Sequence, residues 1–592
     1  MASASVQFGR LRRQLAPHGK RLAAGAVALM ALNIIGAVLP LLVQDTIDRL
    51  APGFTMGSLA GGAAVLLGLA TIMAAVRMAS RLLVFGVGIS VEMDLRQQLF
   101  DHLLGQEPDW LARMRTGELI TRATYDVNNI RRMLGFAVLN MVNVVMVYGL
   151  QIPAMVSIDP GLSVAALVLH PAMLLLVHLF GKRMARLQRR QQEHLSELSD
   201  LIQEDLAGIS AIKIYGQQAN EHEAFSVLNR NYRNAALALA KVRSLLFPAL
   251  EKISNLSLLL LLALGAGRLE AATLGDPQGL TIGGFVALLL YAERLVFPTA
   301  LFGFTINTFQ VGQVSLERVQ EVLMRQPRIT DPAAAEPLTP QPAGQLRVRN
   351  LHYRYPDSRR EALAGVSFTL EPGEMVALVG AVGCGKSTIA RLLGRMIDPP
   401  EQSVFLDGQD IRQLRLDDLR GRIALVPQEA YLFTATLENN LRYGQPDTER
   451  QQVVHYAASA QLSQDIDAFP AGLDTMVGER GITLSGGQRQ RSALARALLQ
   501  QAPLLVLDDA LASVDNATAS GILENLRQHR RSTVLFISHQ LAAAASCDRV
   551  LVMEAGRIVQ AGRHQTLLHQ SGPYQQLWRR QELETSWSQS LG

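Results

Sequence analysis

The segment from Gly380 to Ser387 has the residue types and spacing of a loop that binds phosphate groups. Its glycines allow backbone N–H groups to wrap around phosphates, and Lys386 supplies a positive charge for the outer ones. Ser387 offers a hydroxyl for Mg²⁺. The apolar run Met375–Val379 precedes the loop and the helix-like run Thr388–Leu393 follows it, so the loop lies between a strand and a helix N-terminus. This context argues against the alternative, a glycine-rich turn without a ligand.

A second stretch could hold the metal ion that accompanies such phosphates. The apolar run Leu504–Leu507 predicts a strand that ends in Asp508, roughly 120 residues after the loop. In ATPases with a phosphate-binding loop, an acid at this place holds magnesium. Another acid, Asp509, follows directly. An apolar run with an aspartate is weak evidence alone, but together with the loop it predicts a site for ATP and Mg²⁺.

These residues lie in the second half of a 592-residue chain, which is too long for one domain. The first half carries six apolar runs, each long enough for a membrane span of roughly 20 residues. The runs are Leu22–Val43, Leu59–Val87, Leu134–Ile158, Leu162–Phe180, Leu245–Gly267 and Ile282–Phe309. Core helices of a large soluble protein are the alternative, which six such runs in one half disfavour. The first run lacks the cleavage pattern of a signal peptide.

Lysine and arginine are distributed unevenly between the two sides of these spans. The N-terminal tail and two long loops carry 21 of them, whereas the three opposite connections hold only Arg49 and Arg268. Positive charge favours the cytoplasmic side of a membrane. We therefore expect an integral protein of a bacterial inner membrane, with both termini and the second half of the chain in the cytoplasm.

The long loops, about residues 88–133 and 181–244, are polar with helical apolar spacing, so we expect them to extend the membrane helices. Prolines after residue 325 predict an extended linker. From Leu346 on, short β-rich runs alternate with helical stretches, as in an α/β domain. We expect an all-α membrane domain at 1–325, a linker at 326–345, an α/β nucleotide-binding domain at 346–580 and a tail at 581–592.

Cysteine usage and charge argue against a disulfide-stabilised protein and against a nucleic-acid-binding protein. Two cysteines, Cys384 and Cys547, cannot form a disulfide framework, and both lie in the part expected in the cytoplasm. The net charge of +5 is explained by the basic inner loops, and nothing suggests nucleic-acid binding.

The sequence Leu-Ser-Gly-Gly-Gln at Leu484–Gln488 resembles the signature of ATP-binding-cassette (ABC) proteins, and Arg489–Ala497 after it fits as well. Six spans followed by one cassette is the layout of an ABC exporter half-transporter, so the resemblance covers nearly the whole chain. Parts of the two long loops resemble the family's coupling helices, Arg115–Leu119 with Asp126 and Ile212–Gly216. In the family the second loop docks on the partner's cassette, which implies two intertwined chains.

Other cassette elements follow in the family's order, including a segment similar to an exporter coupling segment at Val477–Gly481. The resemblance implies that Tyr355 stacks on adenine and that His539 is the switch histidine. Motif and resemblance together give nucleotide contacts at Tyr355, Gly380, Gly383, Cys384, Gly385, Lys386, Ser387, Thr388, Ser485, Gly486, Gly487, Gln488 and Asp515. Catalytic roles fall to Asp509, His539 and Gln428, and Mg²⁺ ligands are Ser387, Gln428 and Asp508.

Asp509 departs from the family pattern. A competent site in the family has a glutamate at this position, which orients or deprotonates the attacking water. In heterodimeric ABC exporters, one chain keeps its signature but has a weakened glutamate position, and its partner shows the reverse. This chain has an intact signature and the aspartate. The resemblance thus implies a heterodimer in which this chain holds the slow ATP site. A slow homodimer, in which Asp509 is a tolerated variant, is the alternative.

Polar residues within spans point to the substrate path. Glu293, Arg294 and Asn307 in the sixth run are the candidates, with Glu293 the first choice, although pairs between helices would also explain such residues. Spans rich in Leu, Ala and Val suit a small amphipathic drug or lipid. Relatives that import metal–siderophore complexes or export peptides leave the direction and substrate open. A nucleotide-gated regulatory subunit without transport of its own is the competing class.

Overall fold

The structure is a computed structural model that describes residues 15–50, 56–273, 280–338, 342–478, 481, 483–528 and 532–590. The chain forms two compact units. The first contains Met1–Leu104 and Arg115–Arg325, and the second contains Gly105–Met114 and Gln326–Gly592. A short piece of the first long loop therefore belongs to the second unit.

The first unit is all-helical. Within its described residues, six stretches are long and apolar enough to cross a membrane: Ala16–Leu50, Leu59–Leu104, Thr116–Ile158, Pro160–Ala207, Gln218–Glu270 and Ile282–Leu323. They contain all six predicted runs, which confirms the expected fold class of this part. The elements are η1 (Ala16–His18), α2 (Gly19–Leu50), α3 (Met56–Leu104), α5 (Thr116–Thr121), η2 (Arg122–Asp126), α6 (Val127–Arg132), η3 (Met133–Ala137), α7 (Val138–Ile158), α8 (Pro160–Leu167), α9 (His170–Ala207), α10 (Ile209–Ile214), α11 (Gln218–Thr273) and α12 (Ile282–Leu323).

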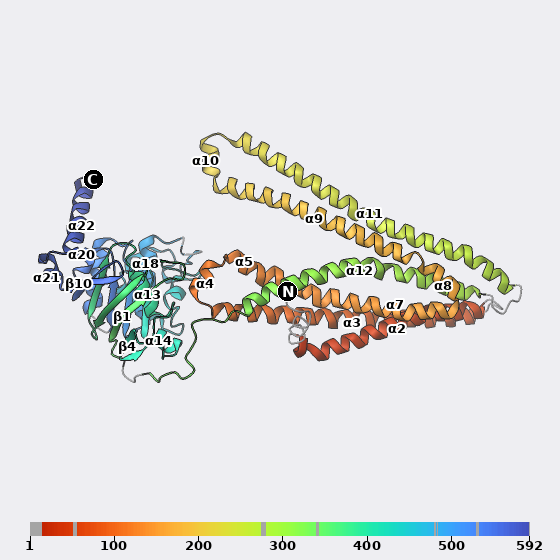
Figure 1. Cartoon of the computed structure of the whole chain (residues 1–592), viewed down its shortest axis with the longest axis horizontal. Helices are drawn as coiled ribbons and strands as arrows, with labels where there is room; N and C mark the ends of the chain where they lie inside the picture. The colour runs from red at the N-terminus through yellow and green to blue at the C-terminus, as the bar shows by residue number, and fades with distance from the viewer. Residues whose placement is uncertain are drawn as a thin grey trace. The chain divides into compact units, whose positions relative to one another are not determined.

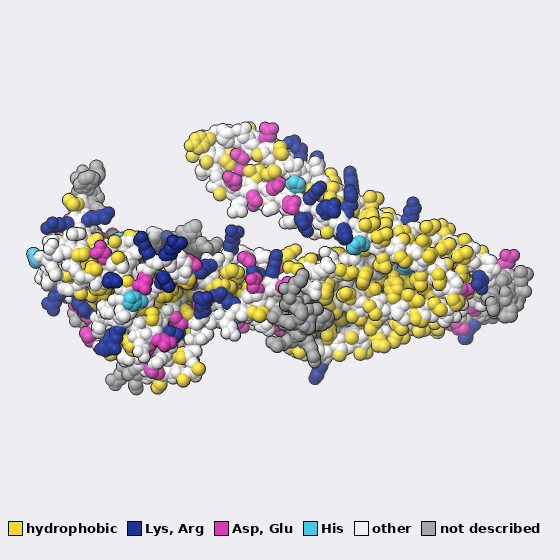
Figure 2. Space-filling model, in the orientation of Figure 1, with side chains coloured by type: hydrophobic (Ala, Val, Ile, Leu, Met, Phe, Trp, Pro, Cys, Tyr) yellow, Lys and Arg dark blue, Asp and Glu magenta, His cyan; other side chains and the backbone are white. Residues whose placement is uncertain are grey.

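Helix α12 forms the centre of this unit and contacts α2, α7, α9 and α11. One of its faces buries Ala287, Leu288, Tyr291 and Leu295 completely. Helices α9 and α11 lie side by side as a long hairpin with α10 at its tip (Figure 1). Apolar side chains cover the surface of the spans, and Lys and Arg gather along the hairpin where that apolar surface ends (Figure 2). This pattern is typical of helices that leave a bilayer.

Turn chemistry explains the connection between α7 and α8. Asp159 caps α8, since its Oδ1 accepts a hydrogen bond from the backbone N–H of Leu162 at 3.0 Å, and Pro160 occupies the first helical position. Proline is favoured there because its missing N–H would have no partner in any case. The chain therefore reverses within a few residues.

The second unit contains two sheets. An antiparallel sheet has the strand order β2-β1-β4-β5, and a second sheet has the order β10-β9-β3-β8-β7-β6, parallel except for β10. The strands are β1 (Leu346–Tyr353), β2 (Leu363–Leu370), β3 (Met375–Gly380), β4 (Val404–Leu406), β5 (Gln409–Asp410), β6 (Ile423–Val426), β7 (Leu504–Asp508), β8 (Thr533–Ile537), β9 (Arg549–Glu554) and β10 (Arg557–Gly562).

Helices cover the parallel sheet, and every residue of β3, β7 and β8 is buried. Burial on both faces explains why these strands read as unbroken apolar runs. The described helices of the whole second unit are α4 (Pro108–Arg113), α13 (Lys386–Leu393), α14 (Leu416–Arg422), α15 (Leu437–Leu441), α16 (Arg450–Ser459), α17 (Ser463–Ala468), η4 (Gly472–Asp474), α18 (Gly486–Leu499), α19 (Asn516–Gln528), α20 (Leu541–Ala544), α21 (His564–His569) and α22 (Pro573–Ser590).

Candidate functional site

The parallel pairing brings three predicted segments to one edge of the sheet. Strand β8 lies between β3 and β7, and Ile537 at its end pairs with both Leu378 and Asp508. The carboxyl ends of parallel strands meet at the same edge, where ligands bind in open α/β sheets. The phosphate loop, the two acids and His539 therefore converge there, as the motifs require.

The phosphate loop has a backbone that only glycine adopts readily. Gly383 has φ of +80° and Gly385 has φ of +109°, and a Cβ on Gly385 would lie 2.5 Å from the carbonyl oxygen of Ala362. Helix α13 begins at Lys386, so its N-terminal dipole points at the loop. The Lys386 ammonium donates hydrogen bonds to the carbonyl oxygens of Gly380 (2.8 Å) and Ala381 (2.9 Å). Backbone donors, a helix N-terminus and a cation thus surround one concave loop.

The residues expected to hold Mg²⁺ lie next to each other. The Ser387 hydroxyl donates a hydrogen bond to Oδ1 of Asp508 at 3.0 Å, although the two residues are far apart in sequence. Burial raises the pKa of Asp508, and the negative charge of Asp509 adds to this effect, whereas the Ser387 hydrogen bond opposes it. Hydroxyl and carboxylate oxygens are the ligands that Mg²⁺ prefers, usually together with phosphates and water. The pair fits a magnesium ion that binds with a nucleotide.

Asp509 lies directly after β7 in a left-handed conformation with φ of +52°, which aspartate tolerates better than most residues. Its N–H donates a hydrogen bond to the carbonyl of Ile537 at 2.8 Å. One carboxylate oxygen lies 2.9 Å from Nδ1 of His539. The Asp509 side chain is 13% exposed and that of His539 is 51% exposed. The arrangement places a carboxylate beside an imidazole at the open edge of the site.

The predicted adenine partner, Tyr355, lies beside α13. The Tyr355 hydroxyl lies 3.3 Å from Oγ1 of Thr388, and Arg391 donates a hydrogen bond to it at 3.3 Å. The Arg391 guanidinium also lies 6.0 Å from the centre of the Tyr355 ring.

Gln428 is exposed just after β6, the strand next to β7. Cys384 is buried within the loop, with its sulfur 3.7 Å from the Lys386 ammonium.

The signature residues begin helix α18 with a complete capping box. The Ser485 hydroxyl accepts from the N–H of Gln488 at 3.2 Å, and the Gln488 side chain accepts from the N–H of Ser485 at 2.9 Å. A Cβ on Gly487 would lie 2.9 Å from the carbonyl oxygen of Ser513, which explains the need for glycine there. Gly486 packs against the same serine.

Asp515 precedes α19, and its carboxylate accepts a hydrogen bond from the N–H of Thr518 at 2.9 Å, which lowers its pKa. Among the described residues, no hydrogen bond or ion pair joins the signature to the phosphate loop of the same chain. Two residues of the predicted coupling segment, Glu479 and Arg480, lie outside the described part of the structure.

The contact of α4 with the rest of the second unit was not found from the sequence. It consists of two ion pairs. Asp109 in α4 pairs with Arg391, and Arg113 pairs with Asp357 at 3.0 Å. The resemblance pointed instead to Arg115–Leu119, which lies in the first unit, where Glu118 pairs with Arg122 at 2.6 Å. A proline directly after Glu107 was the available signal, since it marks a new helix start at Pro108.

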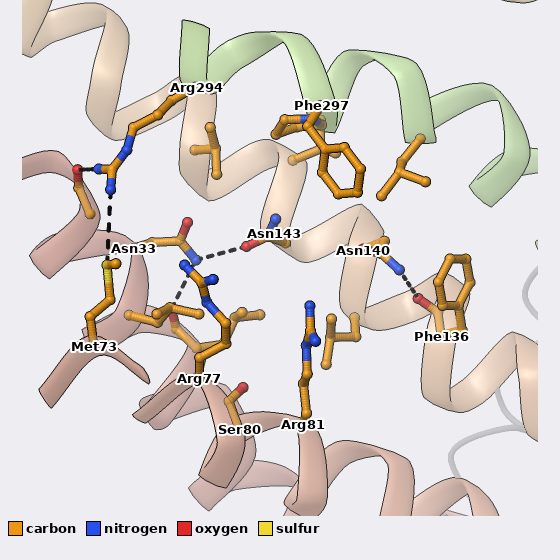
Figure 3. A pocket seen from close by; sticks show the side chains of 18 of the residues that line it. Asn33, Met73, Arg77, Ser80, Arg81, Phe136, Asn140, Asn143, Arg294 and Phe297 are labelled. Carbon is orange, nitrogen blue, oxygen red and sulfur yellow. Dashed lines mark hydrogen bonds between the residues drawn. The ribbon is translucent and has the colours of Figure 1, made fainter. Parts of the chain in front are cut away.

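The membrane unit contains a cavity of about 500 Å³ between α2, α3, η3, α7 and α12 (Figure 3). Of the three predicted substrate residues, Arg294 lines it. Glu293 and Asn307 do not line it, and Glu293 is exposed. Arg77 and Arg81 of α3 also line it, although they were not among the three predicted residues. Hydropathy gives the depth of a residue in a span but not the face of the helix on which it lies.

Comparisons with known proteins agree with this architecture. Residues 22–299 match the family model of the ABC transporter transmembrane region, and residues 363–512 match that of the ABC transporter. The chain is 33% identical to the probable multidrug resistance ABC transporter ATP-binding/permease protein YheI of Bacillus subtilis, with 95% of each chain covered. It is 32% identical to an ATP-dependent lipid A-core flippase of Thiobacillus denitrificans, with 96% of this chain and 97% of the flippase covered.

A solved structure of a bacterial Atm1-family ABC exporter with ATP bound matches with a TM-score of 0.75 and 28% identity. The match covers 96% of this chain and 98% of that one.

Proposed function

The chain belongs to the ABC transporter family as an exporter half-transporter with one membrane domain and one ATP-binding domain, and we propose that it is the subunit with the slow ATP site in a heterodimer. The heterodimer moves amphipathic compounds across the inner membrane by alternating access. The names of the relatives, which refer to multidrug resistance and to a lipid A-core flippase, support this class of substrate.

The phosphate loop, Lys386 and the N-terminus of α13 hold the triphosphate, and Tyr355 stacks on the base. Ser387 and Asp508 would hold Mg²⁺, which would neutralise charge on the phosphates. Gln428, Asp509 and His539 would act on the outermost phosphate, with the Asp509 carboxylate orienting the attacking water. The signature of the partner would close the site, because no hydrogen bond or ion pair joins this chain's own signature to its phosphate loop among the described residues.

Asp509 together with an intact signature carries the proposal. Aspartate is shorter than glutamate by one methylene, roughly 1.5 Å of reach. A misplacement of about 1 Å can cost on the order of 10²-fold in rate. The capped N-terminus of α18, with Ser485 exposed, is by contrast a complete phosphate-binding surface that would serve the partner's site.

The test compares ATP hydrolysis in the two possible assemblies. We expect the purified chain alone to bind ATP but to turn it over slowly. In the complex with a partner that has the glutamate, replacing that glutamate should stop hydrolysis, whereas Asp509→Ala should only reduce it. Robust turnover by the chain alone that Asp509→Ala abolishes would contradict the slow-site proposal.

Turnover by the chain alone that depends on Asp509, even at a low rate, would favour the second candidate, a slow homodimeric exporter in which Asp509 is a tolerated variant. The contact of 2.9 Å between Asp509 and His539 is the observation in its favour, because it shows a carboxylate already beside the switch histidine. A regulatory subunit without transport has less support, since its signature would have no partner site to complete.

A further inference from the structure

The cavity in the membrane unit combines an apolar wall with an excess of positive charge. Leucine, valine, phenylalanine, methionine and proline side chains form more than half of the wall, including Phe136 and Phe297. Three arginines, Arg77, Arg81 and Arg294, reach it from α3 and α12. None of the described residues that line it is an aspartate or a glutamate. The cavity therefore carries three cations without an internal counter-charge.

The three arginines are held differently. Arg294 donates a hydrogen bond to the carbonyl oxygen of Gly36, and its other nitrogen lies 4.0 Å from the Met73 sulfur. Arg77 and Arg81 are one helical turn apart on α3, so both face the same way. In Figure 3 they extend from α3 toward Asn33, Asn140 and Asn143. None of the three forms an ion pair in the part of the chain that the structure describes.

A second observation also points to a ligand. Gln151 lines the same cavity, is 5% exposed, and has a side-chain oxygen without a hydrogen-bond donor. A buried acceptor without a partner costs free energy unless a ligand or water supplies the donor. Arginines inside membrane spans are likewise costly and normally mark a ligand path or a charge pair. Here no carboxylate among the described residues forms such a pair with the three arginines.

We propose that this cavity selects anionic amphiphiles, molecules with an apolar body and a phosphate, sulfate or carboxylate group. Guanidinium groups bind such anions through paired N–H donors, and the apolar wall takes the hydrocarbon part. A cationic compound meets three like charges and is disfavoured. The inference rests on the proposed transport function and defines its substrate class further.

The test uses the full-length transporter in phosphatidylcholine nanodiscs and three probes with one dodecyl chain: dodecyl phosphate, dodecyl maltoside and dodecyltrimethylammonium. Binding is measured with empty nanodiscs subtracted. We expect dodecyl phosphate to bind at least tenfold more tightly than the cation. Arg77→Gln, Arg81→Gln and Arg294→Gln should each raise its Kd by roughly tenfold, the loss expected for one hydrogen bond to a charged group.

Arg190→Gln, on the exposed surface of α9, is the matched control and should leave the Kd unchanged. Arg77→Lys should recover part of the affinity because it keeps the charge.

Competition by phosphatidylglycerol would identify a lipid anion as the ligand, and its absence would identify soluble amphipathic anions. Equal or tighter binding of the cation, with ATP hydrolysis intact, would overturn this inference but not the transport function. A transporter that hydrolyses no ATP would instead contradict the proposed function, whichever probe it binds.

Discussion

Two neighbouring aspartates at the end of β7 have different surroundings and therefore different tasks. Asp508 is buried against the Ser387 hydroxyl, whereas Asp509 turns its carboxylate toward His539 at the open edge of the sheet. Asp508 is the residue type that the ABC family has at its position, whereas Asp509 stands where the family has a glutamate. The chemistry of this chain's own site thus depends on how far the Asp509 carboxylate reaches.

Asp509→Glu tests that dependence. The added methylene brings the carboxylate closer to the attacking water, so we expect ATP turnover at this site to rise by about tenfold or more. The measurement is ATP hydrolysis in a complex whose partner has its own catalytic glutamate replaced by glutamine, which isolates this chain's site. Asp509→Asn is the matched control and should not exceed the residual turnover of the natural chain in this background. An Asp509→Glu variant no faster than Asp509→Asn would show that reach does not limit the site.

Short motifs named the phosphate loop, Lys386 and the two acids that the structure brings to one edge of the sheet, because the spacing within each motif is local and does not depend on the rest of the fold. The pair of Asp109 and Arg391 was missed for the opposite reason. Its two residues lie in distant segments, and only the tertiary fold of the second unit brings α4 beside α13. A single sequence contains no local signal for such a contact.

At the scale of elements, the signature is both a helix cap and a proposed phosphate site. Ser485→Ala removes the cap of α18, which we expect to cost about 1 kcal/mol of unfolding free energy. Ser485→Asp keeps a good cap but adds a negative charge where the partner's phosphate would bind. We therefore expect the aspartate variant to be as stable as the natural chain but to lose hydrolysis at the partner's site.

Thermal unfolding of the purified chain and ATP hydrolysis by the heterodimer separate the two effects. Full hydrolysis by the Ser485→Asp complex would contradict a role of this serine at the partner's phosphate. A loss of stability equal to that of Ser485→Ala would instead show that aspartate does not replace the cap.

The membrane helices show where prediction from sequence stops. Length and hydropathy gave all six spans, because a bilayer imposes them on any chain. The rotation of each helix depends on its neighbours, so Arg77 and Arg81 on α3 could not be assigned to the cavity, and Glu293 was preferred to them. The π-helical turns η2 and η3 were not predictable either, since their residues carry no pattern that separates a π-helical turn from an α-helical one.

At the scale of the whole molecule, an apolar surface outside the membrane spans is exposed in the described part of the chain. Ile214 and Tyr215, at the tip of the hairpin formed by α9 and α11, are 77% and 75% exposed. Two large apolar side chains side by side in a polar region indicate a contact with another protein surface. The proposed occupant is the cassette of the partner subunit, in agreement with the resemblance of Ile212–Gly216 to a coupling helix.

This contact gives a prediction for the assembled transporter. The double change Ile214→Glu and Tyr215→Glu replaces the apolar contact by charge, so we expect substrate-stimulated ATP hydrolysis by the dimer to fall by about tenfold or more. The isolated chain should keep its thermal stability, because neither side chain packs on the rest of it. Lys213→Gln, an exposed change in the same helix, is the control and should have little effect. If the double variant retains full stimulated hydrolysis, the tip does not carry the coupling between the two chains. An unstable double variant would show that these side chains stabilise their own chain instead.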